Sequence, residues 1–164
     1  MIVFQFFTNR FFEDGVISAE RMEEAKIAAE LELHPVERGY RKLGWREAVG
    51  ASGTIKAIAK ILEETGWSSG GITGEGLDQL WDACIEAGHV ENLKLQGLQS
   101  ERALVLPGGL AILKGIFEIL RIKKMNASPG ALREGILHEL FGRVQHDDPR
   151  EMSVRRLCER FQVD

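Results

Sequence analysis

A glycine-rich turn that leads into a helical pattern is the segment of this sequence best suited to chemistry. Residues 50–56 are Gly-Ala-Ser-Gly-Thr-Ile-Lys, and apolar side chains recur at helical spacing from Ile55 to Leu62. Such a turn leaves backbone N–H groups free to bind an anion at the helix start. Thr54 is predicted to cap the helix, which places Lys56 in the first turn, where a bound phosphate would offset its unfavourable interaction with the helix dipole. The same residues also fit an ordinary glycine turn with a solvated lysine, and they lack the spacing of a P-loop.

Two further glycine turns precede helical patterns. Gly108 and Gly109 follow a short apolar stretch, where packing of a helix or approach of a ligand both explain them. Arg133 lies near the start of a predicted helix, where its guanidinium suits either an oxyanion or a salt bridge to a nearby carboxylate.

His146 and Asp147 do not make a metal site, because one histidine beside acids on a predicted linker is not a ligand set. The residues alone therefore predict a phosphate-binding α/β fragment.

The order of the sequence patterns is typical of an α/β fold, in which short β-type stretches precede amphipathic helices. Strands are predicted at residues 3–7, 45–49, 104–106 and 122–127, and helices at residues 77–87 and around the apolar stripes that end at Leu33, Leu62 and Leu120. Ser18 is expected to cap the first helix, and Pro35 is expected to kink or end it. Residues 66–76, rich in glycine and serine, are predicted to be a loop, and Ser128 and Pro129 to start a final helix.

Composition excludes several classes of protein. A formal net charge of −4 in 164 residues argues against a nucleic-acid surface, so a polyanionic ligand needs a local basic pocket. The apolar runs fall short of the roughly 20 residues of a membrane-spanning helix, and the start does not resemble a secretion signal, so we expect a cytoplasmic protein without a membrane partner. Cys84 and Cys158 have no C-x-x-C neighbour and are predicted to be reduced.

Both ends of the chain have the pattern of segments taken from a longer polypeptide. Residues 1–7 are unusually apolar for a free terminus, and an apolar set at helical spacing near the other end has no predicted packing partner: Val154, Leu157, Cys158 and Phe161. An unpaired strand edge at residues 3–7 is expected to promote self-association, which favours a homodimer.

Three sequence blocks in order resemble the exopolyphosphatase/guanosine pentaphosphate phosphatase family. They are residues 50–56, residues 101–113 with their Leu-Pro-Gly-Gly-Leu turn, and residues 130–137, Gly-Ala-Leu-Arg-Glu-Gly-Ile-Leu. The resemblance implies an α/β fold that is a partial ribonuclease-H-like (actin-like ATPase) domain, with a short sheet flanked by helices. Residues 1–145 would be an incomplete second actin-like domain, and residues 146–164 a linker and the start of a truncated helical C-terminal region.

The resemblance implies a fragment of a phosphoanhydride hydrolase that releases orthophosphate from polyphosphate or guanosine pentaphosphate. Mg²⁺ is implied for the complete enzyme, but this chain alone is expected to bind none and to hold no catalytic residue, because the family's catalytic glutamate and its G-G-G-S-x-E motif have no equivalent here. The residues expected to line the phosphate channel are Ser52, Gly53, Thr54, Lys56 and Arg133.

An alternative function is a catalytically inactive truncated domain that acts only in polyanion binding or protein association. Its expected protein partner is either a missing N-terminal domain or another copy of the chain.

Overall fold

The computed structural model describes residues 2–128 and 130, and residues 1–128 form a compact unit by themselves. In chain order the elements are α1 (Ile2–Phe11), α2 (Ala19–Leu43), β1 (Ala48–Gly50), α3 (Gly53–Glu64), β2 (Ile72–Thr73), α4 (Gly74–Ala87), the 3-10 helix η1 (Val90–Asn92), α5 (Ser100–Ala103), α6 (Leu106–Leu120) and β3 (Lys124–Ala127). The described residues form a three-stranded sheet in the order β1-β3-β2, with β1 parallel and β2 antiparallel to β3.

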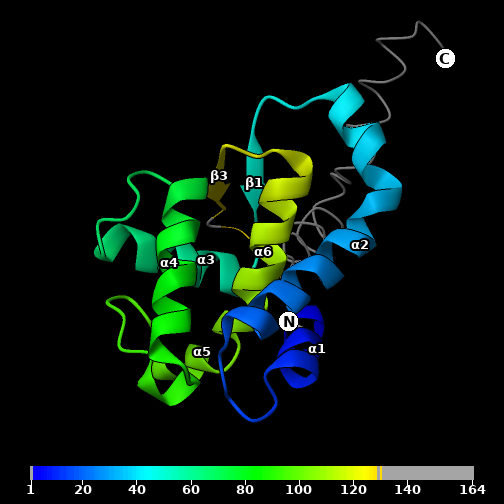
Figure 1. Ribbon diagram of the computed structural model, residues 1–164. Helices are drawn as coiled ribbons and strands as arrows, with labels where there is room; N and C mark the ends of the chain where they lie inside the picture. Colours follow the sequence, from blue (N-terminus) through cyan, green and yellow to red (C-terminus); the bar gives the residue numbers. More distant parts are fainter. Residues whose placement is uncertain (1, 129, 131–164) are drawn as a thin grey trace, which may run out of the picture. The chain divides into compact units, whose positions relative to one another are not determined.

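Helix α6 is the centre of the unit. Ten of its fifteen residues are buried, from Leu106 to Phe117, because the helix is apolar on nearly every side. Helices α1, α2, α3 and α4 all pack against it, and Figure 1 shows α6 between α4 on one side and α2 on the other. The polar residues of α6 pair with the neighbouring helices. Lys114 contacts Asp78 of α4, and Glu118 accepts a hydrogen bond from Lys26 of α2 at 2.9 Å. The unit is thus built around a single buried helix.

Helix α2 begins as its sequence predicts. The Ser18 hydroxyl accepts a hydrogen bond from the backbone N–H of Arg21 at 3.2 Å. Of the predicted apolar stripe, Met22, Ala25 and Ala29 are buried, and Leu33 is half-buried. Pro35 was expected to kink or end this helix, and the second alternative is wrong, because α2 runs on to Leu43. A proline has no backbone N–H and therefore removes one hydrogen bond from the helix. The residues after Pro35 still have the N–H groups that the following turns require.

The strand predicted at residues 3–7 is instead part of α1. An apolar run without strict alternation fits a buried helix as well as a strand, and here helical spacing brings the rings of Phe7 and Phe11 to 5.6 Å between centroids. Phe7 is buried, whereas Phe6 remains 58% exposed. The unpaired strand edge expected at this position is therefore absent, and self-association cannot rest on it.

The strand predicted at residues 104–106 is also wrong. Leu104 follows α5, and Leu106 already begins α6, with Pro107 in the first turn, where a proline needs no hydrogen-bond donor. The predicted loop at residues 66–76 contains the short strand β2 and the start of α4, whose N-cap is Thr73. The other two predicted strands are β1, which begins only at Ala48, and β3.

Three further expectations have different outcomes. Cys84 is buried, and burial raises the pKa of its thiol to about 12. Its reduced state stays a prediction. Cys158 and the helix expected after Ser128 lie outside the described residues. Within residues 2–128, every helix is too short or too polar to cross a membrane.

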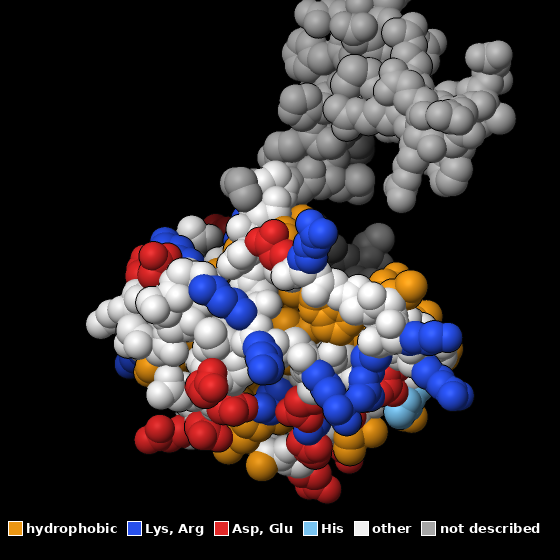
Figure 2. All heavy atoms as spheres, turned by 90° about the horizontal axis from the view of Figure 1, so that it is seen from above, with side chains coloured by type: hydrophobic (Ala, Val, Ile, Leu, Met, Phe, Trp, Pro, Cys, Tyr) orange, Lys and Arg blue, Asp and Glu red, His pale blue; other side chains and the backbone are white. Residues whose placement is uncertain are grey.

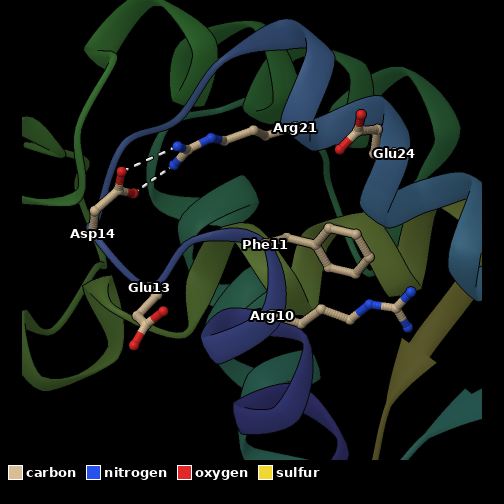
Figure 3. A pocket seen from close by; sticks show the side chains of 6 residues that line it. All are labelled: Arg10, Phe11, Glu13, Asp14, Arg21 and Glu24. Atoms are coloured by element: carbon tan, nitrogen blue, oxygen red, sulfur yellow. Dashed lines mark hydrogen bonds and ion pairs between the residues drawn. The ribbon is translucent and has the colours of Figure 1, made fainter.

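An exposed ion pair fixes the loop between α1 and α2. Figure 3 shows Arg21 reaching from α2 to Asp14, where Nη2 donates to Oδ2 at 3.0 Å and Nη1 donates to Oδ1. The same carboxylate accepts a hydrogen bond from the backbone N–H of Val16 at 3.1 Å. These hydrogen bonds, mainly that from Arg21, lower the pKa of Asp14 from 3.8 to about 2. The loop is therefore held by a carboxylate that has to be ionised.

We expect Gly50→Ala to destabilise the fold. A Cβ atom at this position would lie 2.5 Å from Ile55 Cδ1, 2.8 Å from Ile55 Cγ2 and 2.9 Å from Met125 Sδ, so the packed side chains of Ile55 and Met125 must shift to admit it. The expected cost is about 1–3 kcal/mol in the free energy of unfolding. Gly39→Ala is the matched control, because nothing lies within 4 Å of its added Cβ in the exposed part of α2. Gly39→Ala should raise the free energy of unfolding, measured by urea denaturation, by about 0.5–1 kcal/mol. Equal stability of the two variants would contradict the packing described for Gly50.

The Asp14 pair predicts a defined pH dependence of stability. Because the pKa of Asp14 is lower in the folded chain, its contribution is fully present above about pH 4 and is lost as the pH falls towards 2. Denaturation midpoints should therefore decline less steeply between pH 4 and 2 in Asp14→Asn than in the parent chain. Asp82→Asn, on the exposed face of α4, should follow the parent. Identical pH profiles for the parent and Asp14→Asn would exclude a stabilising role for the pair.

Candidate functional site

The start of α3 forms the base of the candidate site. Strand β1 ends at Gly50, and the Ser52 hydroxyl caps α3 by accepting a hydrogen bond from the N–H of Ile55 at 3.1 Å. The cap predicted at Thr54 is thus wrong by two residues, because Ser52 has the extended backbone that a cap requires. Thr54 is instead a buried residue of the first turn, and Lys56 follows one turn after the cap. The positive end of the α3 dipole lies beside Gly53.

Arg102 reaches this helix start from α5. A Cβ atom on Gly53 would lie 2.9 Å from Arg102 Nη1 and 3.1 Å from Nη2, so the glycine allows the guanidinium to lie over the first residue of α3. The Arg102 side chain is half-buried, and within residues 2–128 no carboxylate lies within ion-pair distance of it. A partly buried guanidinium in this position can donate hydrogen bonds to an anion, which the described residues do not supply.

A basic cavity of about 200 Å³ opens beside this guanidinium. Its lining includes three basic side chains and no acidic one: Gly53, Lys56, Ala57, Lys60, Gly97, Gln99 and Arg102. Lys60 also pairs with exposed Glu64 at 3.6 Å. Because two lysines, one arginine and a helix start converge on a small volume, the basic cavity is suited to a phosphate group.

A larger cavity lies on the other side of Arg102, between α1, the start of α3 and α5. We call it the α1–α5 cavity, and its volume is about 510 Å³. Its lining is mostly uncharged and carries two carboxylates: Gln5, Thr8, Asn9, Phe12, Glu13, Thr54, Glu101, Arg102, Leu104 and Val105. Arg102 is therefore shared by two cavities of different chemistry.

A further cavity of about 370 Å³ lies between α1 and α2. Figure 3 shows that Arg21 is engaged by Asp14, while Arg10 extends from α1 beside Phe11. Because Arg21 is paired with Asp14 and the lining carries three carboxylates beside two arginines, this cavity is the weaker candidate for an anion.

The charges elsewhere do not form a single field. On the face shown in Figure 2, basic and acidic side chains are mixed, in keeping with the formal net charge of −4. In the part of the chain that the structure describes, no three His, Cys, Asp or Glu side chains are grouped to hold a metal ion. The described residues thus do not fit a Mg²⁺ site, and the cations that they offer to a phosphate are arginine and lysine.

The structure brings together four of the five residues predicted to line a phosphate channel. Ser52, Gly53, Thr54 and Lys56 lie in or beside the first turn of α3, whereas Arg133 lies outside the described residues. Sequence reasoning missed Arg102 as a site residue, although it belongs to the block of residues 101–113 that carried the family resemblance. The available signal was an arginine shortly before the Pro-Gly-Gly sequence, which the structure places in the first turn of α6 rather than in a loop.

Comparisons with known proteins agree with these features. Residues 5–144 match the Ppx/GppA phosphatase family. A guanosine-5'-triphosphate,3'-diphosphate pyrophosphatase of Aeromonas hydrophila is 42% identical over 156 residues, which are 95% of this chain and 31% of the relative. A protein of the same name from Photobacterium profundum is 39% identical over 156 residues, with the same coverage. The chain thus spans about a third of the length of these relatives.

Solved structures show the same fold. A Ppx/GppA phosphatase of Aquifex aeolicus superposes with a TM-score of 0.63 at 22% identity, over 82% of this chain and 45% of that protein. A second Aquifex aeolicus structure of the family gives a TM-score of 0.63 at 24% identity. The predicted fold class, a partial actin-like α/β domain, is confirmed. A match over residues 5–144 means that this chain belongs to the Ppx/GppA phosphatase family.

Proposed function

We propose that this chain forms one wall of the substrate site of a phosphoanhydride hydrolase and binds a phosphate group of polyphosphate or guanosine pentaphosphate. The observation that carries the proposal is the Arg102 guanidinium over Gly53 at the start of α3. The names of the Aeromonas and Photobacterium relatives favour a guanosine substrate that carries both a triphosphate and a diphosphate.

The proposed role of the site is to hold and neutralise phosphate oxygens. Phosphoryl transfer depends mainly on positioning and on electrostatic stabilisation of the oxygens around phosphorus. Arg102 supplies a planar fork of donors, and Lys56 supplies a point charge one turn along α3. The Ser52 cap orders the turn that presents the backbone N–H groups of Gly53 and Thr54. Arg133 would add a further cation to the same channel.

Other parts of the proposal concern the complete enzyme. We propose that it requires Mg²⁺, works in the cytoplasm and completes the phosphate channel with residues from an N-terminal domain or a second copy. No step of hydrolysis is assigned to the described residues.

Loss of the Arg102 guanidinium should weaken phosphate binding. We expect Arg102→Ala to reduce the affinity for inorganic tripolyphosphate by about 1.5–3 kcal/mol at low salt, the contribution of a charge-assisted hydrogen bond. Lys56→Ala should act in the same direction, and added salt should weaken every complex through screening. Isothermal titration calorimetry measures each affinity, with denaturation midpoints to show that the variants are folded.

Two variants control this experiment. Arg38→Ala removes an arginine from the exposed second half of α2 and should leave the affinity unchanged. Gly53→Ala keeps Arg102 but places a methyl group where its guanidinium lies, so affinity should fall while stability is kept, because a flexible side chain can move aside. Equal affinities for the parent, Arg102→Ala and Gly53→Ala would overturn the proposed site.

An assay of orthophosphate release from long-chain polyphosphate in the presence of Mg²⁺ distinguishes the two proposed functions, which are hydrolysis and polyanion binding alone. We expect no release by this chain by itself, because the acidic and glycine-rich motifs that the family resemblance implies for catalysis are absent from its sequence. A longer protein that contains this chain should release orthophosphate, and Arg102→Ala should slow that release. Binding without release in the longer protein would favour the alternative.

A further inference from the structure

We propose that Gly97 is a positioning residue that holds the Arg102 guanidinium over the start of α3. The inference rests on the proposed function and adds to it a residue that acts on the bound phosphate only through Arg102. Gly97 lies in the connection between η1 and α5, five residues before Arg102, and both residues line the basic cavity. The place of the arginine therefore depends on how this connection is fixed against α3.

The backbone of Gly97 lies directly on α3. A Cβ atom on Gly97 would lie 3.1 Å from the backbone carbonyl oxygen of Lys60 and 3.2 Å from Ile61 Cα. Both atoms belong to the helix backbone, and Ile61 is 0% exposed, so neither can move aside as the end of a side chain can. The third neighbour, Glu64 Oε2 at 3.1 Å, ends an exposed side chain and can move. The absence of a side chain at Gly97 thus allows the connection to contact the helix itself.

The backbone conformation of Gly97 also favours glycine. Its φ is +81°, in the left-handed region, which a residue with a Cβ atom adopts only at a cost in free energy. The turn around it is closed by a hydrogen bond from the N–H of Leu98 to the carbonyl of Leu95 at 3.1 Å. Both leucines are partly buried against the core. Close contact and backbone conformation are therefore two independent reasons for a glycine at this position.

The turn at Gly97 leads directly into α5. Gln99 follows the turn, and its carbonyl accepts a hydrogen bond from the N–H of Arg102 at 2.8 Å. Helix α5 has four residues, and the side chain of Gln99 does not cap it. A helix of this length is not stable by itself, so the segments on either side of it determine where it lies. Moving Gly97 away from α3 is therefore expected to displace Arg102 as well.

Gly97 and Gly53 fix this connection at two points along α3. The guanidinium of Arg102 lies over Gly53 at the helix start, and Gly97 contacts the backbone at Lys60 and Ile61, about two turns further on. Lys60 also lines the basic cavity between these two contacts. Charge-assisted hydrogen bonds from a guanidinium depend on its orientation, so loss of the Gly97 contact should weaken them.

A double-mutant cycle with inorganic tripolyphosphate, measured by calorimetry, tests the inference. At low salt we expect Gly97→Ala to weaken binding about fivefold when Arg102 is present and to have no effect in the Arg102→Ala background, because the glycine acts through the arginine. In the Lys56→Ala background, Gly97→Ala should still weaken binding by the same factor, because Lys56 is held by α3. Denaturation midpoints show whether each variant is folded.

Two further variants separate the contact from backbone strain. Gly66→Ala is the matched control, because Gly66 has a φ of +73° and nothing lies within 4 Å of its added Cβ. It should lower stability and leave the affinity for tripolyphosphate unchanged. Gly97→Asn adds a Cβ atom, but asparagine tolerates the left-handed region better than alanine. It should keep the loss of affinity with a smaller loss of stability, which also covers the case in which Gly97→Ala does not fold.

The outcomes distinguish this inference from the proposed function. If Arg102→Ala leaves the affinity for tripolyphosphate unchanged, the phosphate site fails, and the role of Gly97 fails with it. If Arg102→Ala weakens binding but neither Gly97 variant does, the phosphate site stands and the positioning role is excluded. The positioning role is also excluded if Gly97→Ala acts equally with and without Arg102, or if Gly66→Ala weakens binding as much.

Discussion

The burial of α6 is the constraint on which the rest of this structure depends. A helix that is apolar on nearly every side is stable in water only when other elements cover it. Helices α1, α2, α3 and α4 provide that cover, and their amphipathic stripes are directed towards it. The short sheet alone, with strands of two to four residues, could not organise a core of this size. Ion pairs from Lys114 and Glu118 then fix the polar edge of α6 against α4 and α2.

The same burial positions the candidate site. Leu106 and Pro107 are buried, which determines where α6 begins, and the turn before them hydrogen-bonds from Val105 N–H to the carbonyl of Arg102 at 3.2 Å. The short α5 is thus held beside the start of α3, although no long element supports it. Gly53 completes the arrangement, because a larger residue would occupy the volume of the guanidinium. A core helix and one glycine together place an arginine at the positive end of another helix.

Arg102 also lies between two cavities of different charge, the basic cavity and the α1–α5 cavity. On one side lysines and the α3 dipole create a positive field in a small volume, and on the other side carboxylates and amides line a larger space. The guanidinium is compatible with both, since its planar fork can donate to a phosphate while its edge and stem contact uncharged groups. Formal net charge, which is −4 for the whole chain, gives no indication of this local separation.

By itself the sequence determined the local features: the Ser18 cap, the apolar stripes of α2, α3, α4 and α6, strand β3, and the glycine turn before α3. Its three ordered motifs were also sufficient to identify the family and the fold class.

Tertiary structure decided what short-range patterns leave open. Residues 3–7 are an apolar run too short to show a period, so whether they became helix or strand depended on packing against α6. Residues 104–106 are similarly short, and they became the turn before α6 and its first residue. The choice of Ser52 over Thr54 as cap depended on where β1 ended. The approach of Arg102 to Gly53 joins residues 49 positions apart, and such a contact arises only from the fold, because no spacing along the chain records it.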